Sequence, residues 1–210
     1  MYRGLSFLVI LVYNVYMIKI LKWEIWGAVF ISLLGILLHF VFDWTGQYYL
    51  VGVFSSVNES VWEHLKLVVV PTVNWLLVER KALKTETHNF FFAKGVGLFV
   101  MPILIVALFY SYIAIWGNNL LVLDIAIFIL AVIVGQFLSY KIMKAPEFSQ
   151  KYNKASIISL VILMAIFIIF TYFPPKFFLF RDPTSGGYGI IGNGSEDGES
   201  NISLPRELIK

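Results

Sequence analysis

Long apolar stretches joined by short polar segments fill the chain as far as Phe173. A helix needs about 20 apolar residues to cross the hydrocarbon core of a membrane. Hydropathy places six candidate spans at about residues 5–18, 26–42, 65–78, 90–115, 120–140 and 157–173. The first is short, and the cations that flank it, Arg3, Lys19 and Lys22, also suit an uncleaved signal-like anchor. The pattern therefore predicts about six transmembrane helices and leaves open whether the first stretch crosses.

This pattern predicts an all-α integral membrane protein, built as a bundle of about six transmembrane helices. We divide the chain into an N-terminal apolar segment (residues 1–22), a transmembrane helical domain (23–190) and a polar, Gly- and Ser-rich tail (191–210). The tail has too few apolar residues to bury, so we expect it to be disordered.

Composition narrows the partners and the chemistry. Hydrophobic residues make up 59% of the chain and charged residues 14%, which excludes an ordinary soluble domain and makes the lipid bilayer the expected partner. The net charge of +3 is spread over several loops, so no nucleic acid partner is expected. The absence of cysteine excludes disulfides and thiolate metal sites. The sequence identifies no protein partner.

The distribution of lysine and arginine predicts the orientation. Residues 79–94 and 141–154 are rich in these cations, so both connections should be cytoplasmic. Residues 43–57 and 116–123 contain neither lysine nor arginine, which places them on the opposite face of the cell membrane. If the first apolar stretch also crosses, both termini lie on that non-cytoplasmic face.

The third apolar stretch is preceded by the polar sequence NESVWEHLK, residues 58–66. From Leu65 alone the stretch is too short to cross a membrane, so we expect its helix to begin at Asn58 or Glu59. At 100° per residue the polar side chains then form one arc of about 160°, made of Glu59, Ser60, Glu63, His64 and Lys66. Carboxylates in a first turn also complement the helix dipole, which is a sufficient structural reason for Glu59 alone.

Two further polar pairs fall on the same predicted face. His39 and Asp43 lie one helical turn apart, a spacing that lets both bind one metal or lets the carboxylate orient the imidazole. The alternative is an interhelical hydrogen bond and a solvated charge. Arg181 and Asp182 follow the last span in a segment that also suits a simple interfacial anchor.

We assign tentative roles to these residues by their side-chain chemistry. The expected catalytic residues are Glu59, Glu63, His64 and Lys66. The expected substrate-binding residues are Asn58, Ser60 and Arg181. The expected metal ligands are His39, Asp43 and Asp182, a donor set compatible with a divalent ion such as zinc, although the sequence alone does not establish any cofactor.

Three strings, HFVFDW (39–44), NESVWEHLK (58–66) and PPKFFLFRDPTSGGYGI (174–190), together resemble a domain-of-unknown-function family of small multi-pass bacterial membrane proteins. The resemblance covers about residues 23–190 and implies the membrane class without an activity. The spacing of His39 and Asp43 is also similar to the motif of membrane-embedded zinc hydrolases of the ceramidase and receptor type. The paired histidines that those proteins carry on their last span are missing here.

Three classes of function are compatible with these features. The first is a membrane-embedded hydrolase or transferase that acts on a lipid or lipid-linked substrate. The second is a small transporter or ion-coupled carrier, in which the same carboxylates bind protons or cations. The third is a non-catalytic scaffold in which the motif only holds helices together. An enzyme requires His39, His64 and carboxylates in one site.

Overall fold

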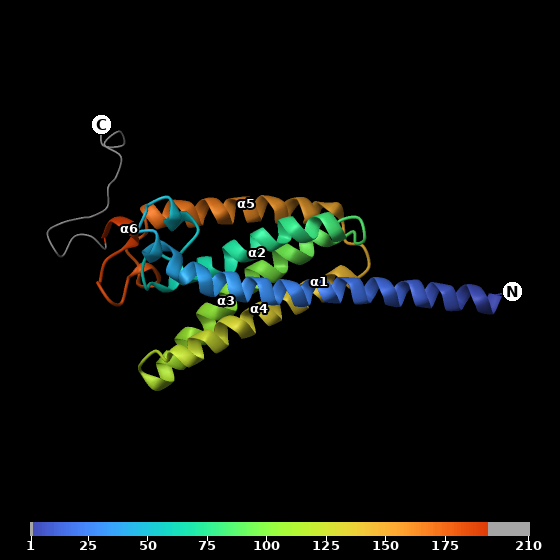
Figure 1. Ribbon diagram of the computed structural model, residues 1–210, viewed down its shortest axis with the longest axis horizontal. Coiled ribbons are helices and arrows are strands. Elements are labelled where there is room, and N and C mark those ends of the chain that lie inside the picture. Colours follow the sequence, from blue (N-terminus) through green and yellow to red (C-terminus); the bar gives the residue numbers. More distant parts are fainter. Residues whose placement is uncertain (1, 193–210) are drawn as a thin grey trace, which may run out of the picture. The chain divides into compact units, whose positions relative to one another are not determined.

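Within the described part of the chain, all regular structure is helical. The computed structural model describes residues 2–192, with side chains described for residues 15–190. The order of elements (Figure 1) is α1 (Tyr2–Trp44), η1 (Val51–Val53), α2 (Val61–Leu83), α3 (Phe90–Trp116), α4 (Leu121–Lys144), α5 (Gln150–Tyr172), η2 (Phe178–Phe180) and α6 (Gly189–Gly192). The predicted all-α fold is confirmed. The disorder predicted for the tail concerns residues that lie, from 193 onward, outside the described ones.

Five helices, α1 to α5, are long and apolar enough to cross a membrane, so the chain is a multi-pass membrane protein. The sequence left open whether the first apolar stretch is a crossing of its own, and the structure shows that it is not a separate helix, because α1 runs without a break from Tyr2 to Trp44. Lys19, Lys22 and Glu24 interrupt the hydropathy but not the helix, since charged residues with straight side chains are good helix formers. The candidate span within α1 is Val15–Trp44.

The predicted start of α2 lies two to three residues too early. The helix begins at Val61 rather than at Asn58 or Glu59, and it reaches spanning length by continuing to Leu83. Its last turn carries Arg80 and Lys81, which complement the negative end of the helix dipole. The polar end of α2 is therefore helical, although hydropathy ends the span near Val78.

The chain forms two compact units, which we describe separately. Unit 1 comprises residues 1–32 and 72–160. Within it, α3 ends at a turn that begins with Gly117, and α4 then runs back alongside α3 (Figure 1). A Cβ atom on Gly97 would lie 2.6 Å from the carbonyl oxygen of Gly135, so glycine permits the two backbones to approach this closely.

Unit 2 comprises residues 33–71 together with the chain from Val161 onward. Its core cluster contains Phe42, Val57 and Ile190, with Tyr49, Val51 and Tyr172 packed against it. The indole of Trp62 stacks on Phe167, with 4.5 Å between ring centroids, and lies 4.7 Å from the ring of Phe180. The segment after α5 is thus packed onto the start of α2.

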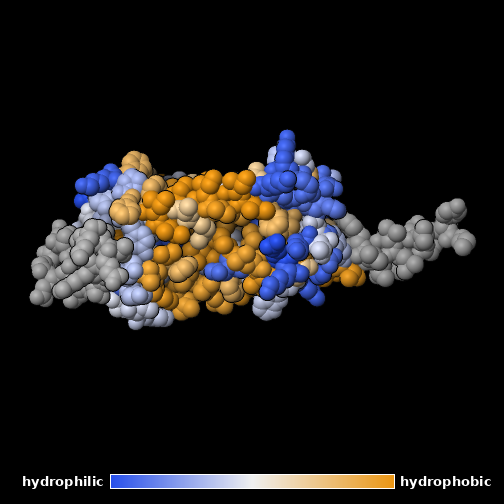
Figure 2. All heavy atoms as spheres, turned by 90° about the horizontal axis from the view of Figure 1, so that it is seen from above, coloured by the Kyte–Doolittle hydropathy of each residue, from blue (hydrophilic) through white to orange (hydrophobic). Residues whose placement is uncertain are grey.

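Apolar side chains cover much of the molecular surface seen in Figure 2. Leu33 and Val161 are each 65% exposed, and many other large aliphatic side chains of the long helices are exposed as well. Exposed apolar surface of this extent is costly in water and favourable in lipid. The surface therefore agrees with the hydropathy of the five helices.

Candidate functional site at the start of α2

Polar side chains just before Val61 fix the start of α2. The hydroxyl of Ser60 accepts a hydrogen bond from the backbone N–H of Glu63 (3.3 Å), which makes Ser60 the N-cap. Asn58 accepts a hydrogen bond from the backbone N–H of Ser60 (2.9 Å) and donates one to the carbonyl of Gly189 (3.4 Å). Both residues, which the sequence predicted to bind substrate, are therefore engaged in holding this turn.

Glu63 and Lys66 point into the interior of unit 2, where they form an ion pair. Both side chains are almost completely buried. The ammonium of Lys66 also donates hydrogen bonds to the Gly52 carbonyl (2.6 Å) and the Thr171 hydroxyl (2.9 Å), so each of its three protons has an acceptor. Glu63 in turn accepts a hydrogen bond from the backbone N–H of Val57 (3.1 Å). The predicted catalytic pair thus ties α2 to η1, to α5 and to the preceding loop.

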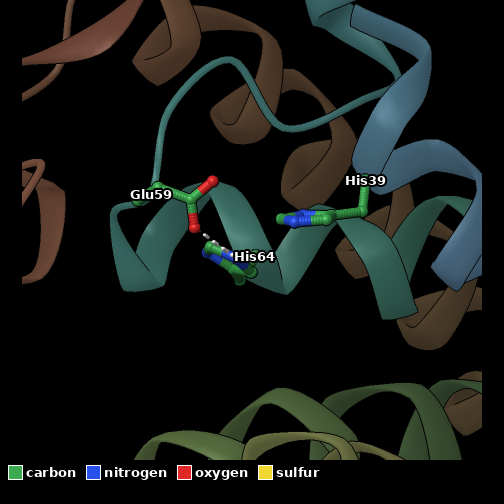
Figure 3. A group of neighbouring side chains, drawn as sticks. All are labelled: His39, Glu59 and His64. Atoms are coloured by element: carbon green, nitrogen blue, oxygen red, sulfur yellow. Dashed lines mark ion pairs between the residues drawn. The ribbon is translucent and has the colours of Figure 1, made fainter. Parts of the chain in front are cut away.

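A second set of side chains, all within unit 2, gathers on the other side of the motif (Figure 3). His39 extends from α1, Glu59 from the loop before α2, and His64 from α2 itself. One ligand atom from each lies within 4.8 Å of the other two. Nε2 of His64 is 3.4 Å from Oε2 of Glu59, and the two imidazole rings are 5.2 Å apart between centroids. We call these three residues the His–Glu–His group.

His64 presents Nε2 to this group because its other ring nitrogen is already engaged. Nδ1 lies 2.9 Å from the carbonyl oxygen of Ser60, which can only accept, so Nδ1 carries the hydrogen. In the neutral ring Nε2 then carries a lone pair on the side of Glu59, whereas in the protonated ring Nε2 donates to that carboxylate. A hydrogen bond from one ring nitrogen to a backbone carbonyl is the usual way in which a metal-binding histidine is oriented. His39 has a weaker counterpart, with 3.5 Å between Nδ1 and the hydroxyl of Ser56.

Glu59 supplies the negative charge of the group. Its side chain is 54% exposed and lies outside the membrane-spanning helices. The contact with His64, first as a hydrogen-bond partner and then as a positive charge, lowers the pKa of Glu59 from 4.5, although partial burial acts in the opposite direction. Glu59 is therefore a carboxylate at neutral pH, the form that binds a metal ion.

The remaining predicted residues lie outside the His–Glu–His group. Asp43 is exposed, one turn beyond His39 on α1. Asp182 is buried and accepts hydrogen bonds from the backbone N–H of Thr184 (3.0 Å) and from the hydroxyl of Ser185 (2.6 Å), so its carboxylate stabilises its own turn. Arg181 is exposed, and its role in binding an anionic group stays a prediction. Of the three predicted metal ligands, His39 alone enters the group.

Sequence reasoning missed a buried charged cluster in unit 1. It assigned Lys94 to a cytoplasmic connection and gave no role to Glu24 or Glu79. The structure places Lys94 within α3, in ion pairs with Glu24 (2.7 Å) and Glu79 (2.5 Å). The available signal was a set of isolated charges next to apolar stretches, because such charges in membrane helices are usually paired.

Exposed aromatic side chains adjoin the His–Glu–His group. The ring of Phe40 contacts His39 edge-on, with 4.9 Å between centroids, and stacks on Trp44 at 5.8 Å. Trp44 is 69% exposed and ends the candidate span of α1. Exposed tryptophan at the end of a span is typical of the membrane–water interface. The His–Glu–His group thus lies next to exposed aromatic surface at the end of α1.

Comparisons with known proteins give a family but no activity. No curated protein and no solved structure matches the chain. One family model matches residues 12–190, which include all five candidate spans and all three members of the His–Glu–His group. The chain therefore belongs to this family, a family of unknown function (DUF6512).

Proposed function

We propose that the protein is a membrane-embedded, metal-dependent hydrolase or transferase that acts on a lipid or lipid-linked substrate. The observation that carries the proposal is the convergence of His39, Glu59 and His64, whose ligand atoms lie within 4.8 Å of one another. A zinc ion bound by two imidazoles and one carboxylate is a common catalytic arrangement, because three protein ligands leave a fourth position for water or substrate. Zinc in such a site supplies a Lewis acid and lowers the pKa of water.

The spacing between His64 and Glu59 is compatible with metal binding. Two ligand atoms bound about 2.0–2.1 Å from a tetrahedral zinc lie about 3.4 Å apart. Nε2 of His64 and Oε2 of Glu59 are separated by 3.4 Å. A charge-assisted hydrogen bond between nitrogen and oxygen is normally shorter, about 2.7–2.9 Å. The free lone pair on Nε2 of His64 and the carboxylate form of Glu59 both suit coordination.

Asp43 is the candidate for proton transfer in this proposal. It follows His39 by one turn of α1, and its exposed carboxylate is not engaged in any side-chain hydrogen bond among those found in the described residues. A carboxylate beside a zinc ligand can accept the proton of an attacking water or alcohol. In this assignment Asp43 acts as a general base rather than as the metal ligand that the sequence predicted. Glu63 and Lys66 then serve to position the helix that carries His64.

The substrate class follows from the surroundings of the group. Phe40, Trp44 and Phe54 expose aromatic surface to the lipid interface, where an acyl chain and its head group meet. If all five helices cross, the order of the elements along the chain assigns residues 45–60 and the segment after α5 to one side of the membrane and the basic ends of α2 and α4 to the other. By the positive-inside rule the His–Glu–His group then faces the non-cytoplasmic side.

Metal analysis tests the first part of this proposal. The full-length protein, purified in detergent without chelator, is equilibrated with zinc, dialysed and analysed by inductively coupled plasma mass spectrometry. We expect about one zinc ion per chain in the wild type and loss of most of it in His64→Ala and Glu59→Gln. The matched control is His88→Ala, which removes an exposed histidine of unit 1. Equal zinc in wild type and His64→Ala would contradict the site.

Lipid turnover tests the second part. Zinc-loaded wild type and Asp43→Asn are incubated with vesicles made from total lipid of the expression host, and the products are followed by mass spectrometry. We expect product in the wild type and a loss of about 100-fold or more in Asp43→Asn at unchanged zinc content. If the loaded wild type leaves every lipid class unchanged, the hydrolase and transferase proposals are both wrong even where zinc is bound.

A further inference from the structure

Unit 1 buries three ionisable side chains in one cluster. Glu24 of α1, Glu79 of α2 and Lys94 of α3 are all at least 97% buried. The ammonium of Lys94 lies 2.7 Å from Oε1 of Glu24 and 2.5 Å from Oε2 of Glu79, so both carboxyl groups share one cation. Each of these helices is a candidate membrane span, which makes the burial of charge especially costly.

Polar side chains of α4 and α2 complete the surroundings. The hydroxyl of Ser139 donates a hydrogen bond to Oε1 of Glu24 (2.7 Å), and the amide of Gln136 donates one to the backbone carbonyl of Glu24 (3.2 Å). A Cβ atom on Gly27 would lie 2.1 Å from Nε2 of Gln136 and 2.5 Å from Nε1 of Trp75. Glycine at this position therefore lets Gln136 and Trp75 close over the cluster.

The charges of the cluster do not balance. Two carboxylates and one ammonium leave a net charge of −1, and the other groups that contact them, Ser139, Gln136 and Trp75, are neutral. An uncompensated charge buried in the interior is strongly destabilising. In addition, Oε2 of Glu24 and Oε1 of Glu79 are buried without a hydrogen-bond donor in the described part of the chain. One bound proton would remove the excess charge and supply a donor.

The contacts indicate which carboxyl group carries that proton. Oε1 of Glu24 receives hydrogen bonds from both Lys94 and Ser139, which stabilise the ionised form. Glu79 has an ion pair with Lys94 and lies beside the indole of Trp75, but the indole N–H makes no hydrogen bond within the described residues and no hydroxyl donates to Glu79. Glu79 is therefore the less stabilised anion of the two.

We propose that Glu24, Glu79 and Lys94 form a binding site for one exchangeable proton, held by Glu79 while Glu24 pairs with Lys94. Uptake of the proton changes the cluster from a net charge of −1 to neutral, and release restores the charge. Buried carboxyl groups that exchange protons within membrane helices serve as proton relays in pumps and transporters. The site belongs to unit 1 and does not depend on the proposed metal site.

Infrared spectroscopy of the full-length protein in detergent tests this site. We expect a carboxylic acid C=O band at neutral pH that shifts in heavy water and disappears in Glu79→Gln, because glutamine mimics the protonated side chain without its acid group. The matched control is Glu86→Gln in an exposed ion pair with Lys19, where the band should be unchanged. A wild type without the band, or a Glu79→Gln variant that keeps it, would overturn the proposal.

A second variant separates the proton from a mere structural role of Glu79. In Glu24→Gln, Lys94 has one carboxylate left, so Glu79 should ionise and the band should vanish although Glu79 is present. Persistence of the band in Glu24→Gln would overturn the charge argument. Spectra in sodium- and potassium-free buffer address the other way to balance the charge. A band that appears only after these cations are removed would show that a metal cation, and not a proton, occupies the site.

Discussion

Among the residues whose side chains are described, two lysines are buried, and the two differ in how their charge is balanced. Lys66 in unit 2 faces one carboxylate, Glu63, and its remaining protons are bound by the Gly52 carbonyl and the Thr171 hydroxyl. Lys94 in unit 1 faces two carboxylates, Glu24 and Glu79. The pair in unit 2 is neutral overall and every ammonium proton is bound, although Oε1 of Glu63 has no donor among the described residues, so its charge gives no reason to take up a proton or an ion. The cluster in unit 1 carries an excess negative charge, which a proton or a cation would neutralise. Residue types alone therefore do not distinguish a structural ion pair from a binding site.

The largest expected effect breaks the balanced pair. Glu63→Gln leaves the Lys66 ammonium buried without a counter-charge, which should lower the free energy of unfolding by about 3–5 kcal/mol. Thermal or denaturant unfolding in detergent measures the change. The double variant Glu63→Gln, Lys66→Met carries no buried charge and should recover part of this loss. A double variant as unstable as the sum of the single ones would show that the two residues do not act as a pair.

A smaller effect is expected when Lys94 is removed from the unbalanced cluster. Lys94→Met should cost about 2 kcal/mol at neutral pH, because both carboxyl groups can then take up protons instead of remaining charged. The folded variant would hold more protons than the unfolded chain, so its free energy of unfolding should fall as the pH rises. Unfolding measured from about pH 5 to about pH 8 checks this slope. A slope equal to that of the wild type would contradict it.

The most direct comparison of the two units replaces one buried glutamate of each by glutamine and compares the change in the free energy of unfolding. Glu79→Gln should change the free energy of unfolding by about 1 kcal/mol or less, because glutamine has the shape and neutrality of the protonated carboxyl group. The matched variant is Glu63→Gln, measured under identical conditions. If both substitutions cost the same, the charge states of the two clusters do not differ in the way we propose.

The smallest change in the free energy of unfolding is expected for the exposed contact between Glu59 and His64. This change is the reference against which the effects at the buried pairs are compared. The side chains of Glu59 and His64 are 54% and 34% exposed, so Glu59→Gln should cost about 0.5 kcal/mol or less. The pKa of Glu59 is lowered in the folded state, so its contribution is complete above the unfolded value of 4.5 and is lost as the pH falls below it. Wild type and variant should therefore become equally stable at low pH, as unfolding measured from about pH 6 downward would show.

The sequence predicted most of the residues of the candidate site but not how they are arranged in space. NESVWEHLK was identified as polar and placed at the start of a span, and the structure agrees, with residues 61–66 forming the first turns of α2. The division of the motif into a surface group with Glu59 and His64 and a buried pair with Glu63 and Lys66 was not predicted. That division depends on what packs against each face, and Gly52, Thr171 and His39 come from other segments.

The sequence by itself determined the membrane class and most of the helices. Runs of apolar side chains must leave water, and in lipid a helix satisfies every backbone hydrogen bond locally, so hydropathy predicts the spans without tertiary information. Where charges interrupted the pattern, at Lys19 to Glu24 and beyond Val78, the predicted boundaries were wrong. A hydropathy scale counts every charged residue as exposed, because it does not include the oppositely charged residue that can pair with it in the folded protein.

Only the tertiary structure decided which charges are buried and with what. Hydropathy assigns Lys94 to a loop because lysine is polar. In the structure Lys94 is buried in α3, where its charge is paired with Glu24 and Glu79 from other helices. The free energy of a buried charge is set by the few groups within hydrogen-bonding distance of it, and those groups are chosen by helix packing. The same packing brings His39 to Glu59 and His64 and so creates the one group suited to a metal among the described residues.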